Sequence, residues 1–459
     1  MATYDLVVRG GLAVIGGAES QVDIGVVGET IVQIGGDMAG STEIDAKGML
    51  VLPGAIDPHV HLTSPGVWGT GPSWVDDFDS GSAAALAGGI TTIGNMTFLR
   101  DGELPLEGLE REATLAREMA RADVILHPVL RQLSPALLDQ IPNLLAHGWN
   151  TIKYFMSMPT FDPQVEGYLE ATARAGASGL LTMIHCEDYA IIEFATQQLL
   201  TSGRESLRYY PESRPVVSEV VATERAVAFA ATTGAPVYVV HLSSRAALDV
   251  CQRAQAQGLP VFVETRPLYL HLTRERFEEP DGAKYVGQPP LREPEDVEAI
   301  WAGLQDGSVQ VVGSDHAPWS LAAKVEPGLT VATVRPGVEN LEVQLAMLYS
   351  EGVRQGRLSL SRLVEVTAAN PAKLFGLFPT KGCIAIGSDA DLVVFDPNLT
   401  KTVGAPRYSQ CDYSVYDGWQ VTGWPVTTIL RGQVAYEGDA VLAPAGSGRV
   451  LARHATRKL

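Results

Sequence analysis

The sequence predicts a (β/α)8 barrel of the TIM type together with a small β-sandwich domain that is built from both ends of the chain. Three observations lead to this prediction. Between Pro53 and Phe378, short buried runs alternate with helical stretches, which is the pattern of parallel βα units. Both ends of the chain consist instead of short β-like runs separated by glycine turns. The length of 459 residues accommodates one barrel, for which about 250 residues is typical, and a smaller companion.

Eight apolar runs are the candidate strands of the barrel. Helical stretches such as Leu106–Arg121 and Asp296–Gln305 lie between them, as a sequence of βα units requires. The runs are, in chain order, Met49–Ile56, Thr91–Gly94, Val124–His127, Thr151–Phe155, Leu181–His185, Val237–His241, Val261–Glu264 and Val309–Asp315.

The strand candidates at the two ends predict one composite domain. We expect it to comprise residues 1–52 plus 379–459, and we expect the barrel to comprise residues 53–378. The terminal runs are Tyr4–Arg9, Asp23–Val27, Ile31–Ile34, Ala390–Phe395, Val426–Leu430 and Gln433–Tyr436.

Composition and charge limit the possible partners. The net charge of −19 repels nucleic acid and anionic lipid, so we expect neither as a ligand. No run reaches the roughly 20 apolar residues that a membrane helix needs, and the N-terminus lacks the pattern of a signal peptide. The four cysteines are far apart, which favours a reduced, cytoplasmic enzyme, although disulfides stay open.

Polar residues end five of the eight predicted strands. In a barrel of this kind the carboxyl ends of the strands meet at one mouth, where active sites are built. Distant parts of the sequence would therefore meet there, which is the main argument for function. The residues are Asp57-Pro58-His59-Val60-His61, Lys153, His185, His241 and Asp315.

The four histidines in this set are candidate metal ligands. His59 and His61 are two residues apart in an extended segment, so their side chains point to one face and can hold one ion. His185 and His241 each end an apolar run. A single histidine there is more often a hydrogen-bonded core residue, but two on neighbouring strands favour a zinc site.

Lys153 and Asp315 complete the set. A free ammonium at the end of a buried strand, beside metal ions, is costly, so we expect Lys153 to be neutral and to take up carbon dioxide as a carbamate. That anion can bridge two metals. Alternatively, the stem of Lys153 packs while its amine reaches solvent. Asp315 can bind an ion and carry a proton, or it can serve as a helix N-cap.

Together these side chains predict a hydrolase with two divalent metal ions. Such a pair lowers the pKa of a bridging water toward neutrality, so that hydroxide forms, and it polarises a carbonyl. The expected reaction is hydrolysis of an unactivated acyl or amide bond, with Asp315 moving the proton to the leaving nitrogen.

Several motifs resemble those of the cyclic amidohydrolases of the hydantoinase and dihydropyrimidinase group, within the amidohydrolase superfamily. The resemblance covers essentially the whole chain. The motifs are the run Pro-Gly-Ala-Ile-Asp-Pro-His-Val-His-Leu at 53–62, Gly-Gly-Ile-Thr-Thr at 88–92, Glu-Thr-Arg-Pro-Leu-Tyr-Leu at 264–270, Pro-Pro-Leu-Arg at 289–292, Gly-Ser-Asp-His-Ala at 313–317, Asn-Pro-Ala-Lys-Leu-Phe-Gly at 370–376 and Gly-Ser-Asp-Ala-Asp-Leu-Val-Val at 387–394.

This resemblance implies a role for each candidate residue. His59, His61 and Asp315 would hold the more buried ion, His185 and His241 would hold the second, and Lys153 would be the N6-carboxylysine between them. Asn340 is similar to the asparagine whose backbone holds the cyclic amide. The group is typically zinc-dependent, cytoplasmic and tetrameric, so we expect the same here.

The chain also departs from the pattern of the group. Met158 stands where D-selective hydantoinases and dihydropyrimidinases carry an oxyanion-stabilising tyrosine, and Gln288 stands where they carry a serine. The metals alone, Tyr154 or a loop residue could replace the tyrosine. Thr63 and Phe98 replace the arginine and asparagine with which dihydroorotases bind a carboxylate, which disfavours a carboxylated dihydropyrimidine.

The substrate predicted from these residues is a cyclic amide with an apolar substituent, such as a 5-substituted hydantoin. The loops expected to shape the pocket, Ser64–Ser73 and Phe155–Phe161, are rich in apolar side chains, which could equally pack a lid. Those side chains are Trp68, Phe155, Met156, Met158 and Phe161. Ring opening of hydantoins or dihydropyrimidines to N-carbamoyl amino acids is the leading prediction. An allantoinase or another cyclic ureide or imide hydrolase is the alternative, and a scaffold protein without activity is a remote one.

Overall fold

The computed structural model describes residues 3–62, 73–457 and 459 of the chain. Its central feature is a sheet of eight parallel strands in sequence order. An isolated bridge between Val60 and His316 joins the first strand to the segment after the last, so the sheet closes almost completely into a barrel. The strands are β6 (Ala55–Val60), β7 (Ile90–Phe98), β8 (Asp123–Val129), β9 (Thr151–Phe155), β10 (Leu181–His185), β11 (Val237–Val239), β12 (Val261–Thr265) and β13 (Val311–Val312).

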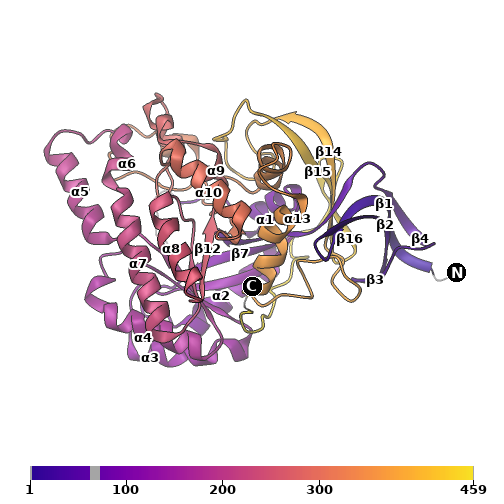
Figure 1. Ribbon diagram of the computed structural model, residues 1–459, viewed down its shortest axis with the longest axis horizontal. Coiled ribbons are helices and arrows are strands. Elements are labelled where there is room, and N and C mark those ends of the chain that lie inside the picture. Colours follow the sequence, from indigo (N-terminus) through magenta and orange to yellow (C-terminus); the bar gives the residue numbers. More distant parts are fainter. Residues whose placement is uncertain (1–2, 63–72, 458) are drawn as a thin grey trace.

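Helices cover the outside of this barrel (Figure 1). Several begin directly after the mouth because a polar side chain caps their first turn, as Asp77 does for α1 and Ser244 for α8. The helices are α1 (Phe78–Ala87), α2 (Pro105–Met119), α3 (Pro135–Gln140), α4 (Val165–Ala177), α5 (Tyr189–Thr201), α6 (Tyr210–Ser213), α7 (Val216–Thr233), α8 (Arg245–Ala256), α9 (Pro267–His271), α10 (Pro294–Asp306), α11 (Leu321–Lys324), α12 (Gln344–Met347), α13 (Leu360–Val364) and α14 (Asn370–Leu374).

A second, mostly antiparallel sheet takes nine strands from both ends of the chain. Strand β14 from the C-terminal part pairs with β5 from the N-terminal part, and this pairing joins the two ends. The strands are β1 (Thr3–Ile15), β2 (Ala18–Val27), β3 (Thr30–Ile34), β4 (Ala39–Asp45), β5 (Leu50–Pro53), β14 (Leu392–Thr402), β15 (Gln420–Leu430), β16 (Gln433–Glu437) and β17 (Ala440–Val441). The predicted barrel and the predicted terminal β domain are both confirmed, whereas the exact domain limits stay a prediction.

The first predicted barrel strand, Met49–Ile56, is wrong as a single element. Gly54 divides it into β5, which belongs to the terminal sheet, and β6, which opens the barrel. A Cβ atom at Gly54 would lie 2.2 Å from Oγ1 of Thr91, so only glycine allows the chain to pass so close to β7. The crossing from one sheet to the other therefore lies inside an uninterrupted apolar run.

A buried ion cluster connects the two sheets. The ammonium of Lys381 lies 2.5 Å from Asp391 and 2.8 Å from Asp123, the first residue of β8. The guanidinium of Arg431 also pairs with Asp123. Burial is the largest single influence on the pKa of Asp123 and raises it. The two cations, Lys381 and Arg431, together outweigh burial and hold this pKa below the usual value. The charges from both sheets thus stabilise one another.

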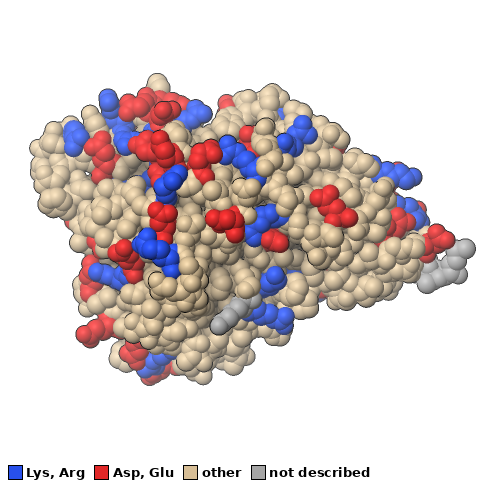
Figure 2. All heavy atoms as spheres, viewed as in Figure 1, with Lys and Arg blue, Asp and Glu red and all other residues tan. Residues whose placement is uncertain are grey.

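Charged residues of both signs are mixed over the face of the molecule in Figure 2, and the basic ones form no continuous stripe there. Within the part of the chain that the structure describes, no helix has both the length and the hydropathy needed to cross a lipid bilayer.

Candidate metal centre and active site

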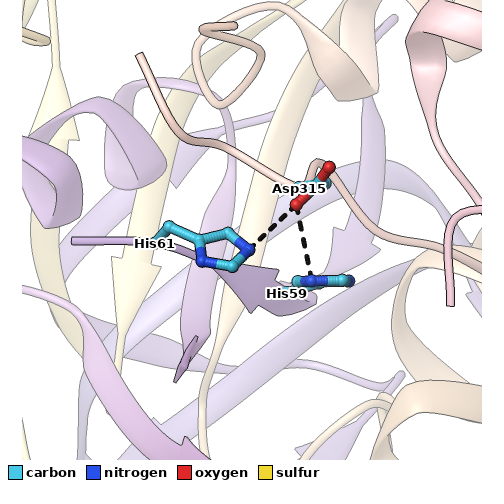
Figure 3. A group of neighbouring side chains, drawn as sticks. All are labelled: His59, His61 and Asp315. Atoms are coloured by element: carbon cyan, nitrogen blue, oxygen red, sulfur yellow. Dashed lines mark ion pairs between the residues drawn. The ribbon is translucent and has the colours of Figure 1, made fainter. Parts of the chain in front are cut away.

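The site begins with three side chains from the two ends of the barrel sheet. His59 and His61 lie at the end of β6, and Asp315 follows β13, so the near closure of the barrel brings them together (Figure 3). The Nε2 atoms of His61 and His59 lie 3.0 and 3.4 Å from Oδ1 of Asp315. All three side chains are buried. Their ligand atoms lie within 4.8 Å of one another, which is close enough to hold one metal ion.

Glu264 sets the orientation of the first imidazole. Its Oε1 atom lies 2.7 Å from Nδ1 of His59, and the carboxyl group also accepts hydrogen bonds from the hydroxyl of Tyr238 and the backbone N–H of His241. A proton on Nδ1 leaves Nε2 of His59 free to bind a metal. Glu264 is fully buried and is not itself a candidate ligand, but it selects the tautomer of His59 that a metal centre requires, with the proton on Nδ1.

His185 and His241 form a second pair. Nδ1 of His185 lies 2.9 Å from Nε2 of His241, and Nε2 of His185 donates to Glu187 at 2.7 Å. Burial lowers the pKa of both imidazoles, so both are neutral near pH 7. Two neutral imidazole nitrogens that face each other in this way could both bind one metal ion in place of the hydrogen bond between them. The rings of His241 and His59, with centroids 5.4 Å apart, connect this pair to the first group.

Lys153 lies between these groups. It is the third residue of β9 rather than the last, and its side chain is fully buried inside the barrel. Its amine lies 4.9 Å from the centroid of the Phe155 ring, which is in turn 5.2 Å from that of His185. Burial lowers the pKa of Lys153 to about 8. A substantial fraction of the amine is therefore neutral near physiological pH, which is the form that reacts with carbon dioxide.

Arg266 holds the other oxygen of Asp315. Its Nη1 atom lies 2.5 Å from Oδ2, and the guanidinium is fully buried directly after β12. Burial opposes ionisation of Asp315, but Arg266 and the neighbouring imidazoles hold its pKa well below the usual value. Asp315 also has a φ of 49°, in the left-handed region that is rare for residues other than glycine. The carboxylate is thus ionised and fixed between two partners.

The unpaired polar atoms of the site fit metal ions. Two buried nitrogens of this cluster have no hydrogen-bond partner and are available to a metal ion: Nε2 of His59 and Nζ of Lys153. Nδ1 of His61 and Nδ1 of His241 are also unpaired, but in these rings it is Nε2 that faces Asp315 and His185. Buried polar groups are normally paired, and the exceptions call for an explanation such as a bound ion. Imidazole and carboxylate donors suit a borderline dication such as zinc. Three of the predicted ligands, His59, His61 and Asp315, therefore lie close enough to hold one metal ion, whereas the roles of all six stay a prediction.

A cavity of about 370 Å³ opens above these residues. Trp74, Phe98 and Phe155 form an aromatic side of it, with ring centroids 5.9 and 6.2 Å apart along the row. The other lining residues are His61, Ser157, Met158, Pro159, His185, Arg214, His241, Gln288, Asp315, Ala317, Pro336 and Gly337. The cavity is therefore large enough for a small ring compound and is apolar on one side.

The predicted pocket residues divide into three groups. Phe155, Met158 and Gln288 line the cavity. Asn340 is fully buried behind it, where its side-chain amide donates to the carbonyl of Ser314 at 3.1 Å. Trp68 lies outside the described residues, so its predicted contact stays a prediction.

Met156 and Phe161, which were proposed from the loops, do not line the cavity, and neither does Tyr154, which was proposed to replace the missing tyrosine. Met156 is buried in the core, and the ring of Phe161 packs on Tyr168 at 5.0 Å. The hydroxyl of Tyr154 lies 3.0 Å from Oγ1 of Thr172, in the layer between the barrel and its helices. Tyr154 is therefore not positioned to replace the tyrosine missing at Met158.

Sequence reasoning missed the orienting residues. Glu264 and Arg266 were visible only as part of a motif, and Glu187 only as the second residue after His185. A charged residue inside the buried run Val-Phe-Val-Glu-Thr was the available signal for Glu264. Trp74 gave no such signal, because an aromatic residue in a loop is equally compatible with packing.

Comparisons with known proteins show to which family the chain belongs. A model of the amidohydrolase family matches residues 50–435. The D-hydantoinase of Geobacillus stearothermophilus is 35% identical over 436 residues, which cover 94% of this chain and 91% of that protein. The D-phenylhydantoinase of Escherichia coli O1:K1 is 34% identical and covers 98% of both chains. The crystal structure of dihydropyrimidinase from Brevibacillus agri NCHU1002 has a TM-score of 0.93, with 34% identity and 99% of each chain covered.

Proposed function

Because this chain belongs to the amidohydrolase family, we propose that it opens cyclic amide rings, namely hydantoins or dihydropyrimidines, to give N-carbamoyl amino acids. The observation that supports this proposal best is the cluster of four imidazoles, one carboxylate and one buried lysine at the floor of a small cavity. The names of the similar proteins, D-hydantoinase, D-phenylhydantoinase and dihydropyrimidinase, support the same class of substrate.

The cluster would hold two divalent ions, most suitably zinc. His59, His61 and Asp315 would bind one, His185 and His241 would bind the other, and Lys153 as N6-carboxylysine would contact both. When bound, such ions lower the pKa of a water between them and polarise the amide carbonyl. The lowered pKa of Lys153 supports the carbamate, since its neutral amine is the reactive form.

Asp315 would carry the proton. Asp315 is ionised, it lines the cavity, and it lies beside the imidazoles of His59 and His61. It can therefore accept a proton at the floor of the cavity and deliver it to the leaving nitrogen. The ion pair with Arg266 at Oδ2 leaves Oδ1 directed toward the imidazoles. Arg266 thereby limits how far this carboxylate rotates during the transfer.

The aromatic side of the cavity supports a substituent that is flat and apolar, as in a 5-arylhydantoin. Trp74, Phe98 and Phe155 provide stacking surface for such a group. Allantoin is the alternative substrate, because Met158 brings no hydroxyl to the cavity. The aromatic side of the cavity favours the hydantoin over it, since these residues do not hydrogen-bond a ureido arm.

A panel of substrates tests the proposal. Purified protein loaded with zinc is assayed for ring opening of 5-phenylhydantoin, 5-methylhydantoin, dihydrouracil and allantoin, and its bound metal is counted by inductively coupled plasma mass spectrometry. We expect turnover of the hydantoins, two metal ions per chain, and loss of turnover in Asp315→Asn. Absence of turnover on all four compounds by the metal-loaded protein would refute the function, and a metal-free, folded protein would favour the scaffold reading.

A cytoplasmic homotetramer also belongs to this proposal. Its support is the resemblance to a group that is typically tetrameric. Sedimentation velocity of the purified protein and fractionation of cells test the two parts separately, and a monomer would contradict the first.

A further inference from the structure

Two loops contribute further residues to the lining of the cavity. One is the segment 286–289 after η6 (Gly282–Tyr285), which contributes Gln288 to the cavity. The other is the segment 335–337, which contributes Pro336 and Gly337. The backbone N–H of Gly337 donates to the carbonyl of Val286 at 2.9 Å, so the loops touch at one point. We call these two segments together the loop wall.

Lys324 joins the two parts of the loop wall. It is the last residue of the short helix α11, and its side chain is completely buried. Its ammonium donates to the carbonyls of Val286 at 2.8 Å, Arg335 at 2.7 Å and Gly337 at 3.0 Å. Every N–H of the ammonium therefore has a carbonyl acceptor, and all three acceptors belong to the loop wall.

Other side chains fix the remaining carbonyls of the first loop from the barrel side. The hydroxyl of Tyr210 donates to the carbonyl of Gly287 at 3.2 Å, and that of Tyr269 donates to the carbonyl of Pro289 at 2.5 Å. Each of these tyrosines contacts one loop only. Lys324 differs because it contacts both loops.

Burial of a lysine for packing alone is unfavourable. Burial lowers the pKa of Lys324 well below its ordinary value, and the guanidinium of Arg266 lowers it further. The three carbonyl acceptors are therefore the groups that favour the charged form, because only an ammonium has three N–H donors for them. A methionine or leucine would fill the same volume without burying an amine. We therefore interpret Lys324 as a residue that connects segments 286–289 and 335–337 through hydrogen bonds, rather than as a core residue that only fills space.

We propose that Lys324 is a positioning residue for the substrate: its ammonium holds segments 286–289 and 335–337 together, and so fixes the position of Gln288, Pro336 and Gly337 in the lining of the cavity in which the ring of the cyclic amide binds. It touches neither the substrate nor the candidate metal ligands. Its loss consequently weakens binding of the ring and leaves the chemistry at the metal cluster in place. This proposal deepens the proposed function and rests on it for the identity of the ring.

The kinetic test compares Lys324→Met with Lys284→Met in the zinc-loaded enzyme, with 5-phenylhydantoin as the substrate. Lys284 is the matched control, because it precedes the same loop but pairs with Asp281 at the surface, at 2.7 Å. We expect Lys324→Met to raise KM by about tenfold or more while kcat changes by less than about threefold, which is the pattern of a lost binding interaction. Metal content should stay equal to that of the wild type in both variants.

A second measurement does not depend on catalysis. Hydrogen–deuterium exchange reports the opening of the bond from Gly337 N–H to Val286, and we expect exchange of this amide to be about ten- to hundredfold faster in Lys324→Met than in Lys284→Met. Lys324→Arg, which keeps the charge, should lie in between, and it replaces the methionine variant if that one does not fold. Wild-type exchange and wild-type KM in a folded Lys324→Met protein would overturn the inference. If no substrate turns over, the proposed function fails, whereas the exchange result still decides the role of Lys324.

Discussion

Replacement of Glu264 by glutamine tests how the protein prepares His59 for a metal ion. The carboxyl group of Glu264 binds Nδ1 of His59 at 2.7 Å, the hydroxyl of Tyr238 at 2.9 Å and the backbone N–H of His241 at 2.9 Å. Glutamine has the same shape and keeps one oxygen on the side of His59 and His241. Its amide group then faces Tyr238, whose hydroxyl can turn to accept. The geometry therefore survives, and the negative charge behind the imidazole is lost.

The expected loss follows from the role of such orienting partners. A buried carboxylate that accepts from a ligating imidazole raises the basicity of that ligand, and its removal typically lowers metal affinity by about 10- to 100-fold. This factor corresponds to about 1.4 to 2.7 kcal/mol of binding free energy at 25 °C. Because Glu264 is fully buried and bonds His59 at 2.7 Å, screening by solvent does not reduce the effect.

Competition with a fluorescent zinc chelator measures this affinity, and Tyr238→Phe is the control. The phenylalanine removes one hydrogen bond to the same carboxyl group but leaves its charge, so we expect zinc affinity within about threefold of the wild type. An unchanged zinc affinity in folded Glu264→Gln would refute the reasoning, since it would mean that the charge behind His59 does not act on the metal. A large loss in Tyr238→Phe would show instead that packing decides the affinity.

Three further changes test other parts of the structure. Lys381→Met leaves Asp391 buried without its cation, and urea denaturation should show a loss of about 3 to 5 kcal/mol in the free energy of unfolding, while a loss below about 1 kcal/mol would contradict the ion cluster as a stabilising link. Trp74→Ala should raise KM for 5-phenylhydantoin by about tenfold and leave KM for 5-methylhydantoin nearly unchanged, and equal effects on both would argue against aryl stacking. Lys153→Ala should lower kcat more than about 100-fold, with partial recovery in acetate or propionate. Full activity without either acid would exclude the carbamate bridge.

The architecture was predictable because it depends on local patterns. Five-residue buried runs such as Thr151–Phe155 and Leu181–His185 match β9 and β10 to the residue, since both faces of a parallel barrel strand are covered and the run stays apolar. The boundary at Gly54 could not be read in the same way. Its cause is the contact with Thr91, which belongs to the next strand, and an apolar run carries no mark of a change of sheet.

The position of the site was predictable for a related reason, and its details were not. The ends of parallel strands meet in a barrel, so His59, His185 and Asp315 had to lie near one another if the fold was right. The aromatic wall depends on where Trp74 and Phe98 point after the chain leaves the strands. That direction is set by packing, so proximity in the sequence, which suggested Phe161, was not a guide.

Strand β12 shows why the supporting residues are harder to identify than the ligands. Its end supplies no candidate ligand, yet Glu264 and Arg266 both follow from it, two positions apart and therefore on one face of an extended chain. Glu264 fixes the proton of His59, and Arg266 fixes one oxygen of Asp315, so that Nε2 of His59 and Oδ1 of Asp315 face each other at 3.4 Å. His59 in β6 and Asp315 after β13 thus each face a charged partner from one segment, Glu264 in β12 and Arg266 directly after it. A double substitution that exchanged Glu264 and Arg266 would keep the composition of the chain. We expect it to turn both candidate ligands, His59 and Asp315, away from a metal ion, because each would lose its partner.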